Sequence, residues 1–489
     1  MGTFSLQNRE TLNRSTYVLH INSNSKVWAF ALEMASQKSA KGHQVLILDT
    51  SNVPSFGFNS FARRRFEKKA LGSELIKVVK KKFSLIEYMQ ENLFAYSKFI
   101  EGRKIDKFPA INAAGIELNA IIHARISTFL GVRDYAFTEI PWRVFRKHFI
   151  TATICSKFFK QNFPVSEPTV IAYNGREVMS AVLLQHAFAT GCETIIGERG
   201  SDSGKFQLFD ESPHYHPNWW DLIKNYKEEY LQESELKLKV GKYKQDRLSG
   251  FDTYFSDIWN PPKDLVKGKN LGSTGYVLYL TSSSTEFSPF EKFDSKLGYA
   301  NQFEGVEILA KECQKQGQTL VIRRHPRSVG IDDVDREEKF WKQVRNYTNV
   351  RYIGPKEDYS SYRLTEDAAV IFVWRSSMGY ESMLMGKPTY ALGTSKWAWD
   401  SQIQCWTREE IGRAIRSPKL ESASVNIIEK FSQFMSSSGT KYTLFKSVEK
   451  WGVTTMSDRK IFNLFLQRVR SKAYDYYLSI SNKSRKRNA

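Results

Sequence analysis

The sequence predicts an α/β protein with two Rossmann-like units in tandem, on the basis of its length and its pattern of strands and helices. A chain of 489 residues exceeds the size at which one hydrophobic core usually stops growing, so two domains are expected. Apolar segments of strand length alternate with helical patterns in both halves of the chain. Near-continuous apolar strands separated by helices indicate parallel sheets that are covered on both faces.

Two β-α-β patterns are predicted in the first half of the chain. The first has strands at 17–22 and 44–49 on either side of a helix at 27–40. The second has strands at 169–173 and 193–196 on either side of a helix at 176–190. The helix of the second pattern is followed by Gly191, which suits a left-handed C-cap. Between the two patterns, we expect mainly helical structure at 60–105 and a further helix at 115–130.

A second sheet is predicted after a Pro-, Lys- and Gly-rich linker near 258–274. Its strands are expected at 276–280, 319–323, 349–353, 368–374 and 389–392, with helices at 301–315 and 377–385. Beyond residue 405 only helical patterns appear, and the chain ends in a basic tail. We therefore expect an N-terminal domain at 1–265, a C-terminal domain at 266–404 and a helical extension at 405–489.

The composition argues against several classes of protein. Hydrophobic residues make up 41% of the chain, which is enough to build cores and argues against global disorder. The first residues lack the apolar core of a signal peptide, and no run of about 18 apolar residues occurs. The cysteines show no metal or disulfide spacing, so we expect a reducing, cytoplasmic setting; they are Cys155, Cys192, Cys313 and Cys405.

The strong positive charge predicts an anionic partner. The chain has 72 Lys and Arg against 52 Asp and Glu, a formal charge of +20. A nucleotide, an acidic polysaccharide, nucleic acid or a lipid surface would each be attracted. The basic segment 62–82 and the basic tail are candidates for peripheral contact with the inner face of a membrane. Nucleic acid is not expected, because the unusual residues concentrate at strand ends rather than on one basic face.

Polar residues at predicted strand ends in the second half indicate a phosphate site. Ligands of parallel sheets bind beyond the carboxyl ends of the strands. Arg324 and His325 follow one such strand, and Ser376 and Ser377 follow another strand where a helix begins. Cationic side chains and the amino end of a helix both bind phosphate, although a solvated basic rim and a simple helix cap are the alternatives. Glu381, one turn into that helix, could accept hydrogen bonds from ribose hydroxyls or serve only as a first-turn acid.

Strand ends in the first half carry the candidate catalytic and acceptor-binding groups. Asn174 and Arg176 follow one predicted strand, and Glu198 and Arg199 end the next. Glu198 is our first candidate for a general base, and an ion pair with Arg199 or Arg176 is the alternative. His214, in the string SPHYHPNWW, is a second candidate acid or base. Neither a DxD motif nor a third ligand near His214 supports a metal site, so none is expected.

Two strings in the second half of the chain resemble the donor half of the capsule polysaccharide biosynthesis family. They are R-x-H-P, which ends at Pro326, and SS-x-G-x-E-x-x-x-x-GKP, which starts at Ser376. Relatives of this family include Kdo and sialic acid transferases. The strings YNGR and ERG in the first half also look like those of surface-carbohydrate proteins. The resemblance implies a GT-B fold, with two Rossmann-like domains that face each other across a cleft. It implies that His325, Ser376 and Ser377 contact the donor phosphate and that Glu381 holds the ribose.

The same resemblance implies a glycosyltransferase that uses a nucleotide-sugar as its substrate. We expect it to work without a metal ion or other cofactor, because cationic side chains and the start of a helix can stabilise the departing nucleotide phosphate. A CMP-sugar is favoured, and UDP- or GDP-sugars stay open. The donor would bind to the C-terminal domain, and a capsule, O-antigen or lipid-linked glycan acceptor would bind to the N-terminal domain. Two alternatives stay open: a CDP-polyol phosphotransferase of cell-wall polymer synthesis, and a non-catalytic protein that binds an anionic polymer.

Overall fold

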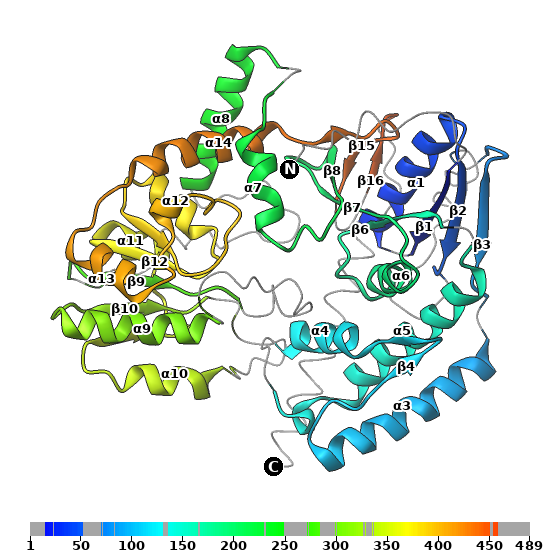
Figure 1. Ribbon diagram of the computed structural model, residues 1–489, viewed down its shortest axis with the longest axis horizontal. Coiled ribbons are helices and arrows are strands. Elements are labelled where there is room, and N and C mark those ends of the chain that lie inside the picture. Colours follow the sequence, from blue (N-terminus) through cyan, green and yellow to red (C-terminus); the bar gives the residue numbers. More distant parts are fainter. Residues whose placement is uncertain are drawn as a thin grey trace.

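The computed structural model contains two α/β units, each built on its own sheet (Figure 1). It describes residues 15–22, 24–51, 70, 72–82, 84–130, 135–164, 167–228, 231–248, 271, 273–283, 299, 301–325, 328, 335, 337–449 and 453–457. Among the helices of these ranges, none has the length and apolar character that crossing a membrane requires.

The first sheet is a two-way wound, mostly parallel sheet. It contains β1 Thr16–Ile21, β2 Gln44–Asp49, β3 Ile76–Lys80, β6 Thr169–Tyr173, β7 Thr194–Arg199, β8 Lys205–Phe209 and β14 Thr440–Lys441. The strand order is β14-β8-β7-β6-β1-β2-β3, and only β8 pairs antiparallel with its neighbours. The chain runs outward from β1 to β3 and returns to β6 on the other side of β1. The carboxyl ends of β1 and β6 therefore flank the switch point where such sheets bind ligands.

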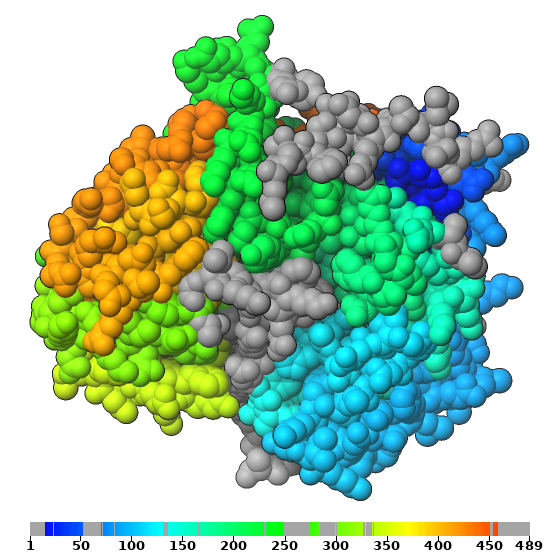
Figure 2. Space-filling model, viewed as in Figure 1, coloured from blue at the N-terminus to red at the C-terminus, as the bar shows by residue number. Residues whose placement is uncertain are grey.

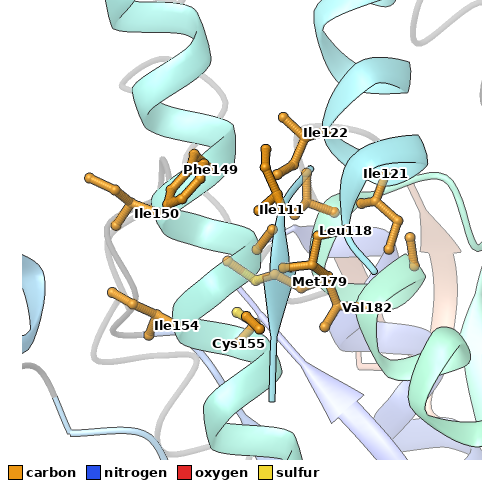
Figure 3. Close-up of a cluster of buried hydrophobic side chains, with 14 of the residues drawn as sticks. Ile111, Leu118, Ile121, Ile122, Phe149, Ile150, Ile154, Cys155, Met179 and Val182 are labelled. Carbon is orange, nitrogen blue, oxygen red and sulfur yellow. The ribbon is translucent and has the colours of Figure 1, made fainter. Parts of the chain in front are cut away.

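Helices cover both faces of the first sheet. They are α1 Ser25–Ala40, α3 Leu85–Ile105, α4 Asn119–Leu130, α5 Trp142–Asn162 and α6 Val178–Ala189, with the short elements β4 Asn112–Ala113, β5 Ile116–Glu117 and η2 Phe137–Glu139. Leu19 and Ile47 pack in the apolar cluster of α1, whereas their neighbours Val18 and Leu48 pack in the cluster of α4, α5 and α6. Figure 3 shows this second cluster, in which α4, α5 and α6 meet through buried apolar side chains. The packing fixes these three helices relative to the switch point.

The second sheet is entirely parallel. It contains β9 Val277–Leu280, β10 Leu320–Arg323, β11 Val350–Ile353, β12 Val370–Val373 and β13 Thr389–Ala391 in the order β11-β10-β9-β12-β13. Its switch point lies between β9 and β12. Its other elements are α9 Gln302–Lys315, α10 Glu338–Arg345, α11 Ser361–Asp367, α12 Met378–Leu384, η7 Ser401–Ile403 and α13 Arg408–Arg416. β9, β10 and β12 are buried along their whole length, as expected for strands with helices on both faces.

Three more helices join the second unit from segments that flank its sheet in sequence. They are α7 Pro217–Lys224, α8 Glu233–Leu248 and α14 Ser422–Ser437. Trp219 of α7 and Tyr243 of α8 belong to the apolar cluster that covers one face of the second sheet. The chain therefore reaches the second unit before the boundary that we predicted at residue 265.

These sheets confirm the predicted α/β fold class with two Rossmann-like units. Two predictions of local structure are wrong. Residues 76–80, expected within a helical stretch, form the edge strand β3, in which Lys77 and Lys80 face solvent and the three apolar residues are half-buried. The segment after residue 405 is not only helical, because β14 pairs with β8, and β15 Phe445–Val448 pairs with β16 Val453–Thr455. Most of the predicted linker 258–274 and the basic tail lie outside the described residues.

A buried carboxylate attaches the C-terminal segment to the first unit. Glu33 of α1 is completely buried. Its Oε1 accepts hydrogen bonds from the backbone N–H of Thr443 at 2.8 Å and from the Thr443 hydroxyl at 2.7 Å, and its Oε2 accepts the Leu444 N–H at 2.9 Å. Gln37 Nε2 also donates to Oε1, at 2.8 Å. The chain that leaves α14 is thus held against α1 before it enters β15.

We predict that Glu33→Gln lowers the free energy of unfolding in urea by about 1–3 kcal/mol. An amide accepts through one atom only, so at least one buried N–H of Thr443 or Leu444 would lose its acceptor. Gln37→Ala, which removes one bond to the same carboxylate, should cost less. A Glu33→Gln protein with the stability of the wild type would contradict this account of the attachment.

Candidate active site

The loops at the carboxyl edge of the second sheet are tied to one another by short polar side chains. Thr281 and Ser282 follow the central strand β9 and are buried. Thr281 Oγ1 accepts the backbone N–H of His325 at 2.7 Å, and Ser282 Oγ accepts the backbone N–H of Arg375 at 2.9 Å. The structure therefore brings the predicted HP and Ser-Ser segments to the two sides of β9. Thr281 and Ser282 were missed in the sequence, although TSSS directly after an apolar strand could have signalled them.

The two serines at the start of α12 have different roles. The Ser376 hydroxyl accepts the N–H of Met378 at 3.2 Å, so this serine caps the helix, as the alternative interpretation held. Ser377 is exposed, and its side chain makes no capping bond. A bound phosphate could therefore reach the Ser377 hydroxyl without uncapping α12. Ser376 instead fixes the turn, because its carbonyl accepts the indole N–H of Trp397 at 3.1 Å.

Arg324 does not point toward a phosphate. Its guanidinium is fully buried, with Nη2 2.9 Å from Glu337 Oε2 and 3.2 Å from Asp335 Oδ1. It also lies over the ring of Trp341, 4.7 Å from the ring centre. A buried cation paired with two carboxylates stabilises the local structure and is not available to a ligand, so we remove Arg324 from the predicted phosphate site.

Glu381 does not present its carboxylate to a ribose. The side chain is buried, and Oε1 forms an ion pair with the guanidinium of Arg247 from α8. Tyr362 donates its hydroxyl to Oε2 at 2.5 Å. Both oxygens are therefore engaged within the second unit. Glu381 connects α12 to α8 and α11 here, which corrects the ribose-binding role that the sequence suggested.

Three residues predicted in the first unit do meet. Asn174 follows β6 with a left-handed φ of 62°, and its Nδ2 donates to Glu198 Oε2 at 2.5 Å. Glu198 Oε1 accepts the backbone N–H of Arg199 at 2.9 Å. The Glu198 carboxylate is therefore held by the Asn174 amide and a backbone N–H, and not by the predicted alternative of an ion pair with an arginine side chain. His214 Nε2 lies 2.9 Å from the backbone oxygen of Asn174. The Arg199 side chain is buried near Tyr442 of the C-terminal segment.

The segment that contains His214 also bridges the two units. His216 Nδ1 lies 2.9 Å from the Thr394 oxygen, in the loop that follows β13, and Trp220 Nε1 donates to the Ser395 oxygen at 2.7 Å. Figure 2 shows the green α7 region running between the orange elements of the second unit and the teal elements of the first. The carboxyl edges of the two sheets are therefore connected directly at this segment, which we call the bridging segment (residues 212–220).

Cations from both units surround the bridging segment. Burial holds the pKa of His214 well below its usual value, and the charges of Arg176 and Lys396 lower it further. Burial likewise holds the pKa of His216 well below its usual value, with Lys396 and Arg375 as the nearest charged contributors. Arg176 follows β6, Arg375 follows β12 and Lys396 follows β13. Lys396 and Arg375 were not among the predicted site residues; both follow strands of the second sheet, and only their position near the bridging segment, which the sequence does not give, distinguishes them.

The low pKa values change the role expected for His214. An imidazole that resists protonation is neutral, and a carbonyl oxygen on one nitrogen means that this nitrogen carries the proton. His214 thus donates through Nε2 to the backbone of Asn174, and His216 donates through Nδ1 to Thr394. A histidine with a depressed pKa is a weak base. We therefore interpret His214 as a group that holds the loop of Asn174 in place.

The switch point of the first sheet holds a carboxylate that the sequence analysis missed. Glu177 caps α6, and its Oε2 accepts the N–H of Ser180 at 3.2 Å and Asn22 Nδ2, from the end of β1, at 3.0 Å. Burial raises the pKa of Glu177, and the positive charge of Arg125 on α4 partly offsets this rise. The only signal for Glu177 in the sequence is its place directly after YNGR. An acid at that place is also explained by helix capping without any other role.

Two cations lie with Glu177 at this switch point. Arg125 Nε is buried and has no hydrogen-bond partner among the residues that the structure describes. Burial lowers the pKa of Lys147 on α5 to about 8, and the positive charge of Arg125 lowers it as well. The negative charge of Glu177 raises this pKa and offsets part of the decrease. The apolar cluster of Figure 3 holds α4, α5 and α6, which carry these groups. Across the part of the chain that the structure describes, no group of three His, Cys, Asp or Glu side chains could hold a metal ion.

A family comparison matches the part of the chain that carries most of the second sheet. Residues 284–406 match a family model described as "putative O-antigen biosynthesis protein". The match includes His325 and the Ser376-Ser377 pair. The predicted resemblance to surface-polysaccharide proteins is confirmed for this segment. Among proteins with curated functions, none matches the chain.

Solved structures of glycosyltransferases also share features with the chain. The β-Kdo 2,4 transferase of KpsC from Thermosulfurimonas dismutans is 13% identical, with a TM-score of 0.35, over 54% of this chain and 78% of that one. The β-Kdo 2,7 transferase of the same protein is 12% identical, with a TM-score of 0.32, over 66% and 88%. A glycosyltransferase from Rickettsia africae is 11% identical, with a TM-score of 0.27, over 87% and 96%.

We predict that Gly379→Ala displaces the start of α12. A Cβ atom at residue 379 would lie 2.1 Å from Cζ2 of the buried Trp397 ring, so the ring would have to move and its bond to Ser376 would be strained. Overpacking of this kind costs about 1–3 kcal/mol of stability in denaturant unfolding. Gly241→Ala in α8, where a Cβ meets no atom within 4 Å, is the matched control and should be neutral or slightly stabilising. Equal stabilities for both variants would contradict the packing argument.

We predict that His216→Gln reduces the loss of stability in acid. The pKa of His216 is far below its usual value in the folded chain, so below about pH 6.5 only the unfolded chain takes up this proton. The free energy of unfolding therefore falls as the pH is lowered, by up to about 1.4 kcal/mol per pH unit for each such histidine. Urea unfolding between pH 7 and pH 5 should show a shallower slope for the variant. An unchanged slope would mean that His216 is protonated in the folded protein.

Proposed function

We propose that this chain is a glycosyltransferase that transfers a sugar from a nucleotide-sugar to a glycan acceptor of the capsule or O-antigen type. The observation that carries the proposal is the contact of the bridging segment with both units, through His214 to the Asn174 oxygen and His216 to the Thr394 oxygen, where Arg176, Arg375 and Lys396 contribute positive charge. Three cations at the meeting point of two Rossmann-like units suit a ligand that carries phosphate. The family match to O-antigen biosynthesis proteins over residues 284–406 supports the substrate class.

In this proposal the donor binds mainly to the second unit, and Arg176 of the first unit contributes a further positive charge to its phosphate. Ser377 and the imidazole of His325, at the ends of β12 and β10, contact the phosphate, and Arg375 and Lys396 stabilise the charge that develops on the departing nucleotide. Fixed cations can supply this stabilisation without a metal ion, which is why we propose a metal-independent reaction. A CMP-sugar is the favoured donor, because the HP and Ser-Ser segments resemble those of CMP-using enzymes.

The first unit binds the acceptor and supplies the base. The acceptor hydroxyl must lose a proton as the new glycosidic bond forms, and a carboxylate with a raised pKa is suited to take it. We propose Glu177 for this role, because burial raises its pKa and the bonds from Ser180 and Asn22 both go to Oε2, whereas both oxygens of Glu198 are engaged, by Asn174 and by the Arg199 N–H. Arg125 and Lys147 would then bind a negatively charged group of the acceptor.

The donor site is tested by thermal stabilisation with CMP, CDP, UDP and GDP, with EDTA present throughout. A ligand that binds only the folded state raises the unfolding temperature, and we expect one nucleotide to do so selectively. Arg375→Gln and Ser377→Ala should each lose that stabilisation, whereas Lys311→Gln, which alters an exposed lysine of α9, should keep it. A response to none of the four would contradict the proposal. Turnover of a CDP-polyol with no nucleotide-sugar accepted would favour the phosphotransferase.

The base is tested by Glu177→Gln in an assay of sugar transfer to isolated surface glycan. We expect kcat to fall by about 10²–10⁴-fold while the nucleotide stabilisation is kept. Because burial raises the pKa of Glu177, wild-type activity should fall on acidification at a higher pH than an ordinary carboxyl group would give. If Glu198→Gln gives the large loss and Glu177→Gln does not, the roles of the two carboxylates are reversed.

A further inference from the structure

Helix α3 carries a continuous stripe of exposed apolar side chains. Its members are Leu85, Ile86, Met89, Leu93, Tyr96 and Ile100, which we call the α3 stripe. Their exposed fractions are 63%, 71%, 57%, 69%, 55% and 36%. With about 100° of rotation per residue, all six fall within about 100° of the helix surface, along four turns. Single exposed apolar residues are ordinary, whereas an ordered stripe of this extent indicates a surface that is covered in use.

The opposite side of α3 is held firmly by the first unit. Ala95, Phe99 and Gly102 are buried, and Phe99 packs against Trp142 of α5 with ring centres 5.2 Å apart. The N-cap Ser84 accepts the N–H of Glu87 at 3.2 Å. The helix therefore does not need the stripe for its own stability. In Figure 1, α3 lies at the outer edge of the first unit, on the side away from the second sheet.

The charges around the stripe are positive at both of its ends. Lys82 precedes the helix and is exposed, and Lys104 lies in its last turn, in line with the stripe, whereas the guanidinium of Arg103 lies over the Phe99 ring and donates to the Ile140 oxygen at 3.3 Å. The nearby acids are already paired: Glu87 binds Lys81 at 2.7 Å, and Glu101 binds Lys98 at 2.8 Å. An apolar stripe with unopposed cations at its ends complements a surface that is apolar inside and anionic outside.

We propose that the α3 stripe inserts into the headgroup region of an anionic phospholipid bilayer and holds the chain on the membrane surface. The six apolar side chains enter the boundary between headgroups and acyl chains, and Lys82 and Lys104 contact lipid phosphates. Tyr96, packed edge-on against Trp142 with ring centres 5.6 Å apart, suits the depth at which aromatic side chains collect in membrane interfaces. This contact is centred on α3 and uses only Lys82 of the basic segment 62–82; residues 76–80 of that segment form a strand of the first sheet.

Vesicle flotation of the full chain tests this inference. We expect the wild type to float with vesicles of phosphatidylglycerol and phosphatidylcholine, and to bind much less to phosphatidylcholine alone. Met89→Gln and Leu93→Gln each remove an exposed apolar side chain, and each should lower the bound fraction by about tenfold. Leu238→Gln, at a residue of α8 that is 75% exposed and outside the stripe, is the matched control and should float like the wild type. All three variants should unfold at the wild-type temperature, because their side chains are exposed.

Three outcomes would overturn the inference. The first is a wild type that fails to float with the anionic vesicles, and the second is stripe variants that float as well as Leu238→Gln does. The third is a wild-type dimer in solution that Met89→Gln and Leu93→Gln dissociate, without any binding to vesicles, which would show that a second copy covers the stripe. The stripe lies outside the proposed donor site, so nucleotide stabilisation should be the same in all of these variants. Failure of the membrane inference is thereby separated from failure of the proposed function.

Discussion

The pair of hydrogen bonds between the bridging segment and the loop after β13 is the contact on which the candidate site depends. His216 and Trp220 each bond a backbone oxygen of that loop, at Thr394 and Ser395. Together with the bond of His214 to the Asn174 oxygen, these bonds connect the loops at the carboxyl edges of the two sheets. Arg176 of the first unit and Arg375 and Lys396 of the second thereby contribute positive charge around the same segment.

The sequence predicted the fold well because its strands are strongly apolar and its turns are clearly marked. Buried strands such as β9, β10 and β12 are nearly continuous runs of apolar residues. An amphipathic helix instead alternates apolar and polar residues, so the two patterns are easily told apart. The edge strand β3 was missed for the opposite reason: its lysines make it similar to the basic helical pattern around it. The short strands after residue 440 depend on partners far away in the sequence, β8 and the α1 surface, and local pattern cannot reveal these.

The site was predicted only where its position follows from topology. Asn174, Glu198, His325 and Ser377 lie at strand ends, and any parallel sheet brings such residues to one edge. Arg324 and Glu381 also lie near strand ends, but each has buried partners that the sequence cannot identify. The ion pairs of Arg324 with Asp335 and Glu337, and of Glu381 with Arg247, depend on how helices and loops fold back over the sheet. Glu177 was missed because an acid that caps a helix looks the same whether or not burial raises its pKa.

The central claim is that one phosphate-bearing ligand is held by residues of both units, and hydrogen exchange tests it most directly. Backbone exchange of the wild-type chain would be measured with and without each of CMP, CDP, UDP and GDP. The account predicts that one nucleotide slows exchange in the loop after β6, around Arg176, and also in the loops at Arg375 and Lys396 of the second unit. Protection confined to the loops of one unit, or no protection by any of the four nucleotides, would contradict it.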